Sequence, residues 1–325
     1  MLTLHLVIAI LAVSIASPRV MAADATYPTR PVRLVVPFPP GSSTNDILAR
    51  ALAQRLTKAI GQQVVVDNRS GAGGTLGTDI VAKAAPDGYT LVIGAAGTLA
   101  IAPSVFTKLP YDPERDFAPI ALFASTPYLM VVKNALPATN IRELIALAKS
   151  TPGSLLFGSS GTGGTPHLCG ELFNSLAGVR LTHVPYKGGA NAITDLISGQ
   201  LDMLCLGVTA LAGPVRSGRA RAIGMATRER SSLMPLVPTV NEQGLEGFEV
   251  NSWSAVMAPA RTPETIVRRL YAEISRIVAT DDMKAFVLSQ GSETVALGPT
   301  EFGSYLRDDI AKWRRVVRDA KLQPN

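Results

Sequence analysis

Short apolar strands alternate with amphipathic helices along most of the chain. In the first part of the sequence, strands are expected over residues 31–37, 63–67 and 89–94, and helices over residues 46–60 and 78–85. The first helix has apolar residues at helical spacing, and Gly61 follows it as a stop. Turns rich in glycine or proline separate these elements. This order of strand and helix predicts an α/β fold with mostly parallel sheets.

The same alternation returns in a second run after a less regular stretch. Residues 117–132 indicate strand, turn and strand, and residues 141–150 indicate a helix. The second run begins with a strand near Leu155, followed by strands expected over 181–185, 201–206 and 220–226 and helices over 167–176 and 191–198. The C-terminal part adds a strand over 249–258 and helices over 263–279, 283–290 and 300–322. Two such runs predict two doubly wound lobes with a ligand cleft between them, beyond the carboxyl ends of the strands.

Two loops occupy the same place in the two runs, between the end of a strand and the start of a helix. The first runs from Phe38 to Asp46 and the second from Ser159 to His167, and both are rich in small and hydroxylated residues. Free N–H groups at a helix start, together with the helix dipole, attract an anion without any arginine. Glycine also lets the backbone approach a ligand closely. We therefore expect both loops to grip one carboxylated ligand, although the same residues also form plain turns and N-caps.

Other chemistries fit these loops less well. Residues 71–74 read GAGG, but they follow the second strand and lack the spacing of a dinucleotide-binding motif, so a tight turn near the first loop is expected there. A hydrolase would need Ser159 or Ser160 beside a histidine, and no G-x-S-x-G motif is present. His167 is instead expected to cap the second loop or to donate to the ligand.

Composition and charge exclude several classes of partner. The chain has 325 residues, of which 47% are hydrophobic and 17% charged, and this composition excludes disorder and allows two modest domains. The formal net charge is +6, or +5 without residues 1–22, which hold Arg19 and no acid. Lys and Arg are spread along the whole length, so nucleic-acid binding is not expected. Two cysteines and three histidines do not give a zinc-ligand spacing, and we expect neither a metal nor a cofactor.

The N-terminus has the features of a secretory signal. Residues 6–15 form an apolar segment too short to span a bilayer, and VMA at residues 20–22 fits cleavage near Ala22. No Lys or Arg precedes this segment, and a buried N-terminal helix is the alternative. Export would allow a disulfide between Cys169 and Cys205, but two buried free thiols acting as small apolar side chains are favoured.

Several segments together resemble the periplasmic substrate-binding proteins of tripartite tricarboxylate transporters, also called Bug-type receptors. The segments are YPTRPVRLVVPFPPG, VVVDNRSGAGGTLGTDIVAKAAPDGYTL, FGSSGTGGTPHLCGELF, HVPYKGGANAITDLISGQLDM, RAIGMATRERS and VPTVNEQG. The resemblance covers essentially the whole chain after residue 22. It implies a two-domain "Venus flytrap" of the type II periplasmic binding kind. The first domain would hold residues 24–125 and 250–325, and the second residues 126–249.

The resemblance also implies a set of ligand-binding residues. In that family, backbone amides, hydroxyl groups and bridging waters of the first strand–helix loops hold the ligand's carboxylate, without an arginine. Carried onto this sequence, the set is Phe38, Gly41, Ser42, Ser43, Asp46, Thr98, Ser160, Gly161, Gly163, Thr165 and His167, with Tyr186 and Asp202 in second place. In that family the first loop usually has the sequence Pro-Phe-x-x-Gly-Gly-x-x-Asp. Here Ser42 replaces the second Gly, and Asn45 is an additional residue before Asp46. Either Asn45 or Asp46 therefore takes the place of the family's Asp.

The expected function is that of a monomeric periplasmic receptor, not an enzyme, that captures a small carboxylate for a membrane permease of the tripartite tricarboxylate type. Two alternatives stay open. One is a hydrolase or nucleotide-dependent enzyme that uses the loops rich in Gly and Ser. The other is a receptor that serves a sensor ectodomain instead of uptake. The sequence does not distinguish among citrate-like acids, dicarboxylates, aromatic acids, nicotinate-like rings and amino acids as ligands.

Overall fold

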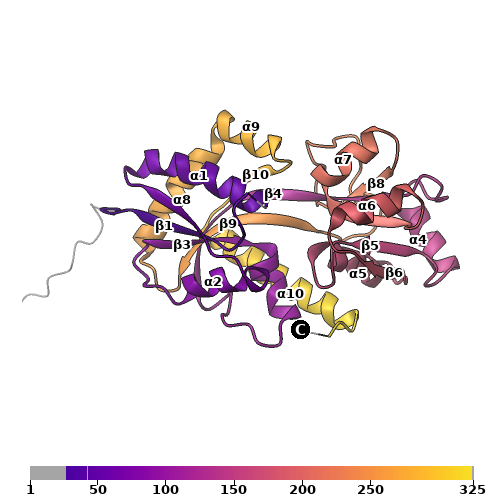
Figure 1. The fold of residues 1–325 in the computed structure, drawn as a ribbon, viewed down its shortest axis with the longest axis horizontal. Helices are drawn as coiled ribbons and strands as arrows, with labels where there is room; N and C mark the ends of the chain where they lie inside the picture. Colours follow the sequence, from indigo (N-terminus) through magenta and orange to yellow (C-terminus); the bar gives the residue numbers. More distant parts are fainter. Residues whose placement is uncertain (1–26, 42, 324–325) are drawn as a thin grey trace, which may run out of the picture.

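The computed structural model describes residues 27–41 and 43–323, which form two lobes of strands and helices (Figure 1). In the first lobe the parallel strands β2, β1 and β3 lie side by side, and β9 runs antiparallel next to β3. The bounds are β1 (Val32–Val36), β2 (Val64–Asn68), β3 (Thr90–Ala95) and β9 (Asn251–Pro259). Strand β10 (Glu293–Leu297) pairs with the first part of β4 (Phe117–Val132). The expected signal peptide lies outside the described residues.

Helices cover the first-lobe strands. They are α1 (Thr44–Ile60), α2 (Thr75–Ala82), α3 (Ala102–Val105), α8 (Glu264–Ala279), α9 (Asp281–Ser289) and α10 (Pro299–Asp319), with the short turns η1 (Ala72–Gly74) and η2 (Ala96–Ile101). Amphipathic spacing explains their packing, since α8 buries Ile266, Leu270 and Ile274 in one apolar cluster with α1 and β4. Of the helices in the described part, none combines the length and apolar character needed to cross a bilayer.

The second lobe repeats the pattern with three parallel strands in the order β7, β5, β6. The elements are α4 (Ile141–Ser150), β5 (Leu156–Ser159), α5 (Thr165–Ala177), β6 (Thr182–Pro185), α6 (Gly189–Ile197), β7 (Met203–Gly207), α7 (Val208–Arg216) and β8 (Arg221–Met225). Helices α4 and α5 belong to one apolar cluster and α6 and α7 to another. The sequence did not predict α7, because Gly213 and Pro214 interrupt its helical pattern.

Strands β4 and β9 cross between the lobes, and β4 corrects one expectation. A turn was expected within residues 117–132, but β4 is one continuous strand of 16 residues. It pairs with β9 up to Pro127 and with β7 from Tyr128 onward. Pro127 therefore lies where the strand changes partners, and its missing N–H is tolerated there. The two-lobed α/β fold expected from the sequence is confirmed.

The cysteines correct a second expectation. Cys169 on α5 and Cys205 on β7 are joined by a disulfide, with Cα atoms 6.3 Å apart, instead of being two free thiols. Both residues are buried, so the bond fastens α5 to the sheet inside the second lobe. Only the fold brings these residues together, since 36 positions separate them in sequence. A disulfide is typical of proteins in an oxidising compartment.

Candidate functional site

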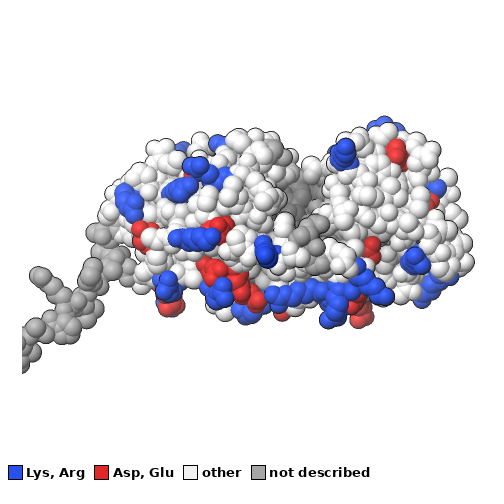
Figure 2. Space-filling model, turned by 60° about the horizontal axis from the view of Figure 1, so that its bottom comes forward, with Lys and Arg blue, Asp and Glu red and all other residues white. Residues whose placement is uncertain are grey.

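A cavity of about 480 Å³ lies at the junction of the two lobes. Its lining comes from the start of α1 (Thr44 and Asn45), the crossing strands (Thr126, Tyr128 and Ser252) and the β7–α7 junction (Gly207, Thr209 and Ala210). None of these eight side chains carries a charge. Figure 2 shows the notch between the two lobes. The cavity therefore offers hydroxyl, amide and backbone groups to a ligand.

The structure places Asn45 and Asp46 on different sides of the first turn of α1. Asn45 lines the cavity, and its Oδ1 accepts a hydrogen bond of 2.5 Å from the Ser254 hydroxyl. Asp46 is fully buried, and its carboxylate accepts hydrogen bonds from Gly41 N–H (2.7 Å), Asn68 Nδ2 (2.7 Å) and Arg50 Nε (3.0 Å). Burial alone would raise the pKa of Asp46, but these hydrogen bonds outweigh it and hold the pKa below its ordinary value. Asn45, not Asp46, is thus the residue that lines the cavity at the lobe junction.

Local bonds hold the other residues of the first loop. Ser43 is the N-cap of α1, and its hydroxyl accepts a hydrogen bond from Asp46 N–H at 3.3 Å. Phe38 is half-buried against the core, and its carbonyl accepts a hydrogen bond from Asn68 Nδ2 at 2.9 Å. Ser42 lies outside the described residues. The first loop is therefore fastened to the neighbouring strand β2 through Asn68.

Thr98 and the GAGG turn pack against the first loop. Thr98 is buried, and its hydroxyl donates to the Ala95 carbonyl at 3.2 Å, so this side chain is not free to meet a ligand. Gly74 has φ 96°, and a Cβ there would lie 2.7 Å from the Thr98 methyl group and 3.2 Å from the Pro37 carbonyl oxygen. Only glycine fits such a position. The expected tight turn close to the first loop is thus present.

The second-lobe residues Ser160, Gly161, Gly163 and Thr165 lie together beyond the carboxyl end of β5. Gly161 has φ 142° and Gly163 has φ 78°, and L side chains rarely adopt the first value. Thr165 is the first residue of α5 and interacts with Tyr128. Burial raises the pKa of Tyr128 to about 12, and its hydrogen bond with the Thr165 side chain offsets only part of this rise. Because Tyr128 lines the cavity, this contact links the second loop to one residue of the cavity lining.

A stacked pair of histidines supports the second loop. The rings of His167 and His183 lie 3.7 Å apart between centroids, at an interplanar angle of 21°. His167 Nδ1 accepts a hydrogen bond of 3.0 Å from Gly163 N–H, and its Nε2 lies 3.6 Å from the Glu171 carboxylate. His183 Nε2 lies 2.7 Å from the Ser159 hydroxyl oxygen. His167 is buried, so it caps the loop from inside and does not reach the cavity.

The Ser159–His183 contact has the length of a nucleophile–base pair, but its surroundings do not suit catalysis. Ser159 is fully buried, and its hydroxyl is also within 3.0 Å of the Gly161 carbonyl oxygen. Burial and the neighbouring His167 ring lower the pKa of His183 to about 4. A substrate has no access to Ser159, so the contact serves to hold the loop. Among residues 27–41 and 43–323, no cluster of three or more metal-ligating side chains occurs.

The helices of the second lobe that follow β5, β6 and β7 all begin at a glycine. Their N-caps are Gly164, Gly188 and Gly207, and within the described chain no side chain caps any of them. Helix α1 differs, because the Ser43 hydroxyl occupies its N-terminus. Uncapped N–H groups and the positive end of the helix dipole favour an anion. The second lobe therefore supplies the groups that suit a carboxylate.

Tyr186 and Asp202 are not brought to the cavity. The Tyr186 hydroxyl donates to Asp195 at 2.7 Å, and burial together with this bond raises the pKa of Tyr186 to about 12. Asp202 pairs with Lys133 at 2.7 Å and accepts a hydrogen bond of 2.7 Å from Leu156 N–H. Asp202 thus joins the amino ends of β5 and β7, at the edge of the sheet opposite the helix starts. This position corrects its assignment as a ligand contact.

The cavity lining was mostly missed by the sequence. None of the expected ligand-binding residues is among the eight lining residues, although Thr44 and Asn45 directly follow Ser43. One available signal was LGVTA at residues 206–210, where a glycine and a threonine again follow a strand. The polar residues of β4 and β9 gave no such signal, because only the crossing of the lobes places them at the junction.

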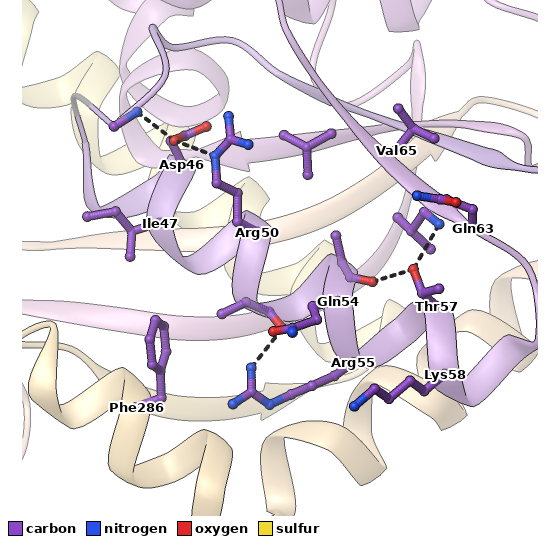
Figure 3. A pocket seen from close by; sticks show the side chains of 15 residues that line it. Asp46, Ile47, Arg50, Gln54, Arg55, Thr57, Lys58, Gln63, Val65 and Phe286 are labelled. Atoms are coloured by element: carbon purple, nitrogen blue, oxygen red, sulfur yellow. Dashed lines mark hydrogen bonds and ion pairs between the residues drawn. The ribbon is translucent and has the colours of Figure 1, made fainter.

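A larger hollow of about 950 Å³ lies along α1, away from the junction (Figure 3). Its lining comes from α1, β2, Phe286 of α9, and Gly41 and Gln63 just before α1 and β2, all in the first lobe, and it includes the expected ligand residues Gly41 and Asp46. It holds Arg50, Arg55 and Lys58, but Arg50 already pairs with Asp46 at 3.0 Å, and Arg55 pairs with an aspartate of α9 at 2.6 Å. Lobe movement cannot enclose a ligand there. We therefore regard the cavity at the junction as the candidate site.

Comparisons with known proteins agree with this architecture. Residues 48–322 match the family model described as tripartite tricarboxylate transporter family receptor. BugT of Bordetella pertussis is 37% identical over 312 residues, which are 95% of this chain and 94% of that protein. A solved R. palustris protein with adipate is 36% identical, covers 92% of this chain and 100% of its own, and has a TM-score of 0.74. MatC from Rhodopseudomonas palustris with bound malate is 34% identical, covers 90% and 100%, and has a TM-score of 0.70. The chain therefore belongs to the family of tripartite tricarboxylate transporter receptors.

Proposed function

We propose that this protein is a periplasmic receptor that binds a small carboxylate between its two lobes and delivers it to a membrane permease of the tripartite tricarboxylate type. The observation that carries the proposal is the cavity at the lobe junction, which has neutral walls and, at Gly207, a helix start without a side-chain cap. The ligands adipate and malate in two solved relatives support a carboxylate as the cargo. A receptor consumes nothing, so no catalytic group is needed.

The two lobes contribute different groups to the proposed grip. Asn45 and the α1 start form the first-lobe side, and its amide Nδ2 is the group left to donate, because Oδ1 already accepts from Ser254. Gly161, Gly163 and Thr165 form the second-lobe side with the start of α7. Main-chain N–H groups donate to the carboxylate oxygens, and each such charge-assisted bond contributes roughly 1.5–3 kcal/mol. A few of these bonds, less the cost of ordering, correspond to about micromolar affinity.

The crossing strands β4 and β9 form the proposed hinge between the lobes. We propose that the lobes comprise residues 24–125 with 250–325, and residues 126–249, and that they rotate about β4 and β9. A ligand favours the closed form only by the difference between its affinities for the closed and open forms. The closed form is then the one that the permease recognises. Export by cleavage near Ala22 completes the proposal and places the disulfide in an oxidising compartment.

A thermal-shift screen with carboxylic acids tests the proposal. Malate and adipate are the first probes, and malamide and adipamide are matched controls that keep the shape but lose the charge. Binding raises the melting temperature as occupancy rises. We expect at least one acid to raise it while the corresponding diamide does not. If no carboxylate changes the melting temperature, or if the bound acid is consumed on incubation, the receptor assignment is wrong.

A variant pair locates the binding event at the lobe junction. Tyr128→Phe removes a hydroxyl from the cavity lining, and Tyr271→Phe removes one from α8 in the first lobe. Calorimetric titration with the acid found in the screen should give about tenfold weaker binding for Tyr128→Phe, the loss of one hydrogen bond. Tyr271→Phe should bind like the unmodified protein. Equal affinities for all three proteins would place the ligand elsewhere.

A further inference from the structure

The C-terminal helix α10 has one apolar and one basic face. Its apolar face buries Phe302, Leu306, Ile310, Trp313, Val316 and Val317. Its exposed cations are Arg307, Arg314, Arg315, Arg318 and Lys321, the last lying just beyond the helix end, and these five residues are here called the α10 basic face. At 100° per residue, Arg307, Arg314 and Arg318 fall within about 40° of one another around the axis. Arg307, Arg314 and Arg318 therefore form a row along the helix, whereas Arg315 lies about 100° around the axis from Arg314 and Lys321 follows the helix end.

The row runs beneath the junction of the lobes. Helix α10 contacts β4 and η2 in the first lobe and α5 in the second. The Ser175 hydroxyl on α5 lies 3.5 Å from the Asp319 carboxylate at the end of α10. Figure 2 shows a band of Lys and Arg along the underside, where α10 passes from one lobe to the other in Figure 1. The surface is therefore placed where a partner meets both lobes at once.

Most of this positive charge is not balanced within the protein. Arg318 pairs with the adjacent Asp319 at 3.2 Å, and Arg307 donates to the Ser304 hydroxyl at 3.0 Å. In the part of the chain that the structure describes, no carboxylate oxygen lies within 4.0 Å of a side-chain nitrogen of Arg314, Arg315 or Lys321. The charges of these three cations are therefore available to a partner.

We propose that the α10 basic face binds an acidic helical segment of a protein partner. The row of Arg307, Arg314 and Arg318 is one residue wide and extends about 16 Å at 1.5 Å per residue, which matches one face of a second helix. A helix with carboxylates along one face can approach these three cations and avoid the acids beside them. The exposed acids of the same segment are Glu301, Asp308 and Asp319.

The small number of aligned cations argues against an anionic membrane as the occupant. Three cations share the row, fewer than the four to eight that are typical of segments that bind anionic lipid, and each contributes only about 1 kcal/mol at a lipid surface. Insertion into lipid is not favoured either, since none of the exposed large apolar residues, Val65, Leu76, Leu236 and Leu288, belongs to α10. The arrangement suits a partner whose charges are placed in register.

Two synthetic helical peptides of the same composition test the proposal. One carries five glutamates along a single face, and the other carries them spread around the helix. Binding to the full, isotopically labelled protein is followed by the NMR shifts of its backbone amides at low salt. We expect the one-faced peptide to bind about tenfold more tightly than the other, with shifts concentrated on α10. Vesicles of anionic phospholipid form a third arm, and we expect them to bind more weakly than the one-faced peptide.

A charge-matched pair of variants completes the test. Arg314→Glu, Arg318→Glu and Lys321→Glu together reverse the row, and Lys58→Glu, Lys149→Glu and Arg269→Glu reverse three exposed cations elsewhere by the same total charge. Only the first variant should lose binding of the one-faced peptide, and both should keep the melting-temperature shift with carboxylates. The proposal is overturned if both triple variants lose binding equally, if both peptides bind alike, or if vesicles bind as well as the one-faced peptide. Because the carboxylate response is measured separately, failure here leaves the receptor function standing.

Discussion

The first-lobe and second-lobe loops follow equivalent strands but are built by different means. The first loop is fixed by side chains, with Asp46 buried beneath it and Ser43 capping α1. The second loop is fixed by glycine geometry and by a stacked pair of histidines, and the helix after it starts without a side-chain cap. The comparison indicates that the two lobes contribute different groups to ligand binding. The first lobe offers a rigid wall, and the second lobe offers backbone N–H groups that an anion can use.

Removing the buried acid is the strongest way to break the first loop. Asp46→Ala removes the buried acceptor that Gly41 N–H, Asn68 Nδ2 and Arg50 Nε share, and we expect a loss of about 3 kcal/mol in the free energy of unfolding. Urea denaturation measures it. The control is Asp282→Ala, which removes the largely exposed partner of Arg55 and should cost less than about 1 kcal/mol. Similar losses in the two variants would mean that Asp46 does not hold the loop.

Altering the backbone of the second loop should affect binding more than stability. Gly161→Ala forces a side chain into φ 142°, so the loop must change shape. We expect affinity for the acid found in the screen to fall at least about 100-fold, or about 2.7 kcal/mol. Calorimetry measures it. Gly178→Ala is the control, because φ 61° there lies at the far end of α5 and any strain stays away from the loop. Undiminished binding by Gly161→Ala would remove the second loop from the site.

The histidine pair makes the stability that the second loop contributes depend on pH. The pKa of His183 is lowered to about 4 in the folded protein, below its ordinary value of about 6.5. The unfolded chain therefore binds the extra proton first, and stability is lost as pH falls through this window. We expect about 1–2 kcal/mol less stability at pH 5 than at pH 7 from this residue. Denaturation at both pH values should show a smaller loss for His183→Gln, and an unchanged loss would exclude His183 as the cause.

Removing a contact between the lobes should have the smallest effect on carboxylate affinity. Glu293 on β10 accepts hydrogen bonds from the Ser232 N–H and hydroxyl, both at 2.7 Å, and from the Ser231 hydroxyl at 3.0 Å. Glu293→Ala removes this link between β10 and the segment after β8, and we expect carboxylate affinity to fall less than about tenfold. X-ray scattering should report a larger radius of gyration for the free variant. A matched change at Glu264, on the exposed start of α8, should alter neither quantity.

The sequence predicted the fold better than the site. Periodicity identified most strands and helices, and α4 was expected over the same residues that it occupies, Ile141–Ser150. It failed for β4, where a turn was expected within residues 117–132 because the change of pairing partner is not visible in sequence. It also missed β10 and α7, whose short or interrupted patterns are stabilised by packing against β4 and β7.

The site was predicted at the level of loops and not of side chains. Residue type and the spacing of glycines indicated where the two loops would be, because turn chemistry is local. Whether Asn45 or Asp46 faces the cavity depends on Asn68, which lies 22 positions after Asp46. The Asn68 Nδ2 group donates one of the hydrogen bonds that hold the Asp46 carboxylate in the core. The placement of Asp202 depends likewise on Lys133 in a different segment. Such distant partners decide the direction of a polar side chain, and a single sequence does not reveal them.

The most direct test of the central claim is a crystal structure of the protein with the tightest-binding carboxylate. We predict that the acid lies in the cavity at the lobe junction, with its oxygens bonded to main-chain N–H, hydroxyl and amide groups from both lobes. A carboxylate held by Arg50, Arg55 or Lys58 in the hollow along α1, or clasped by arginines anywhere else, would contradict the account.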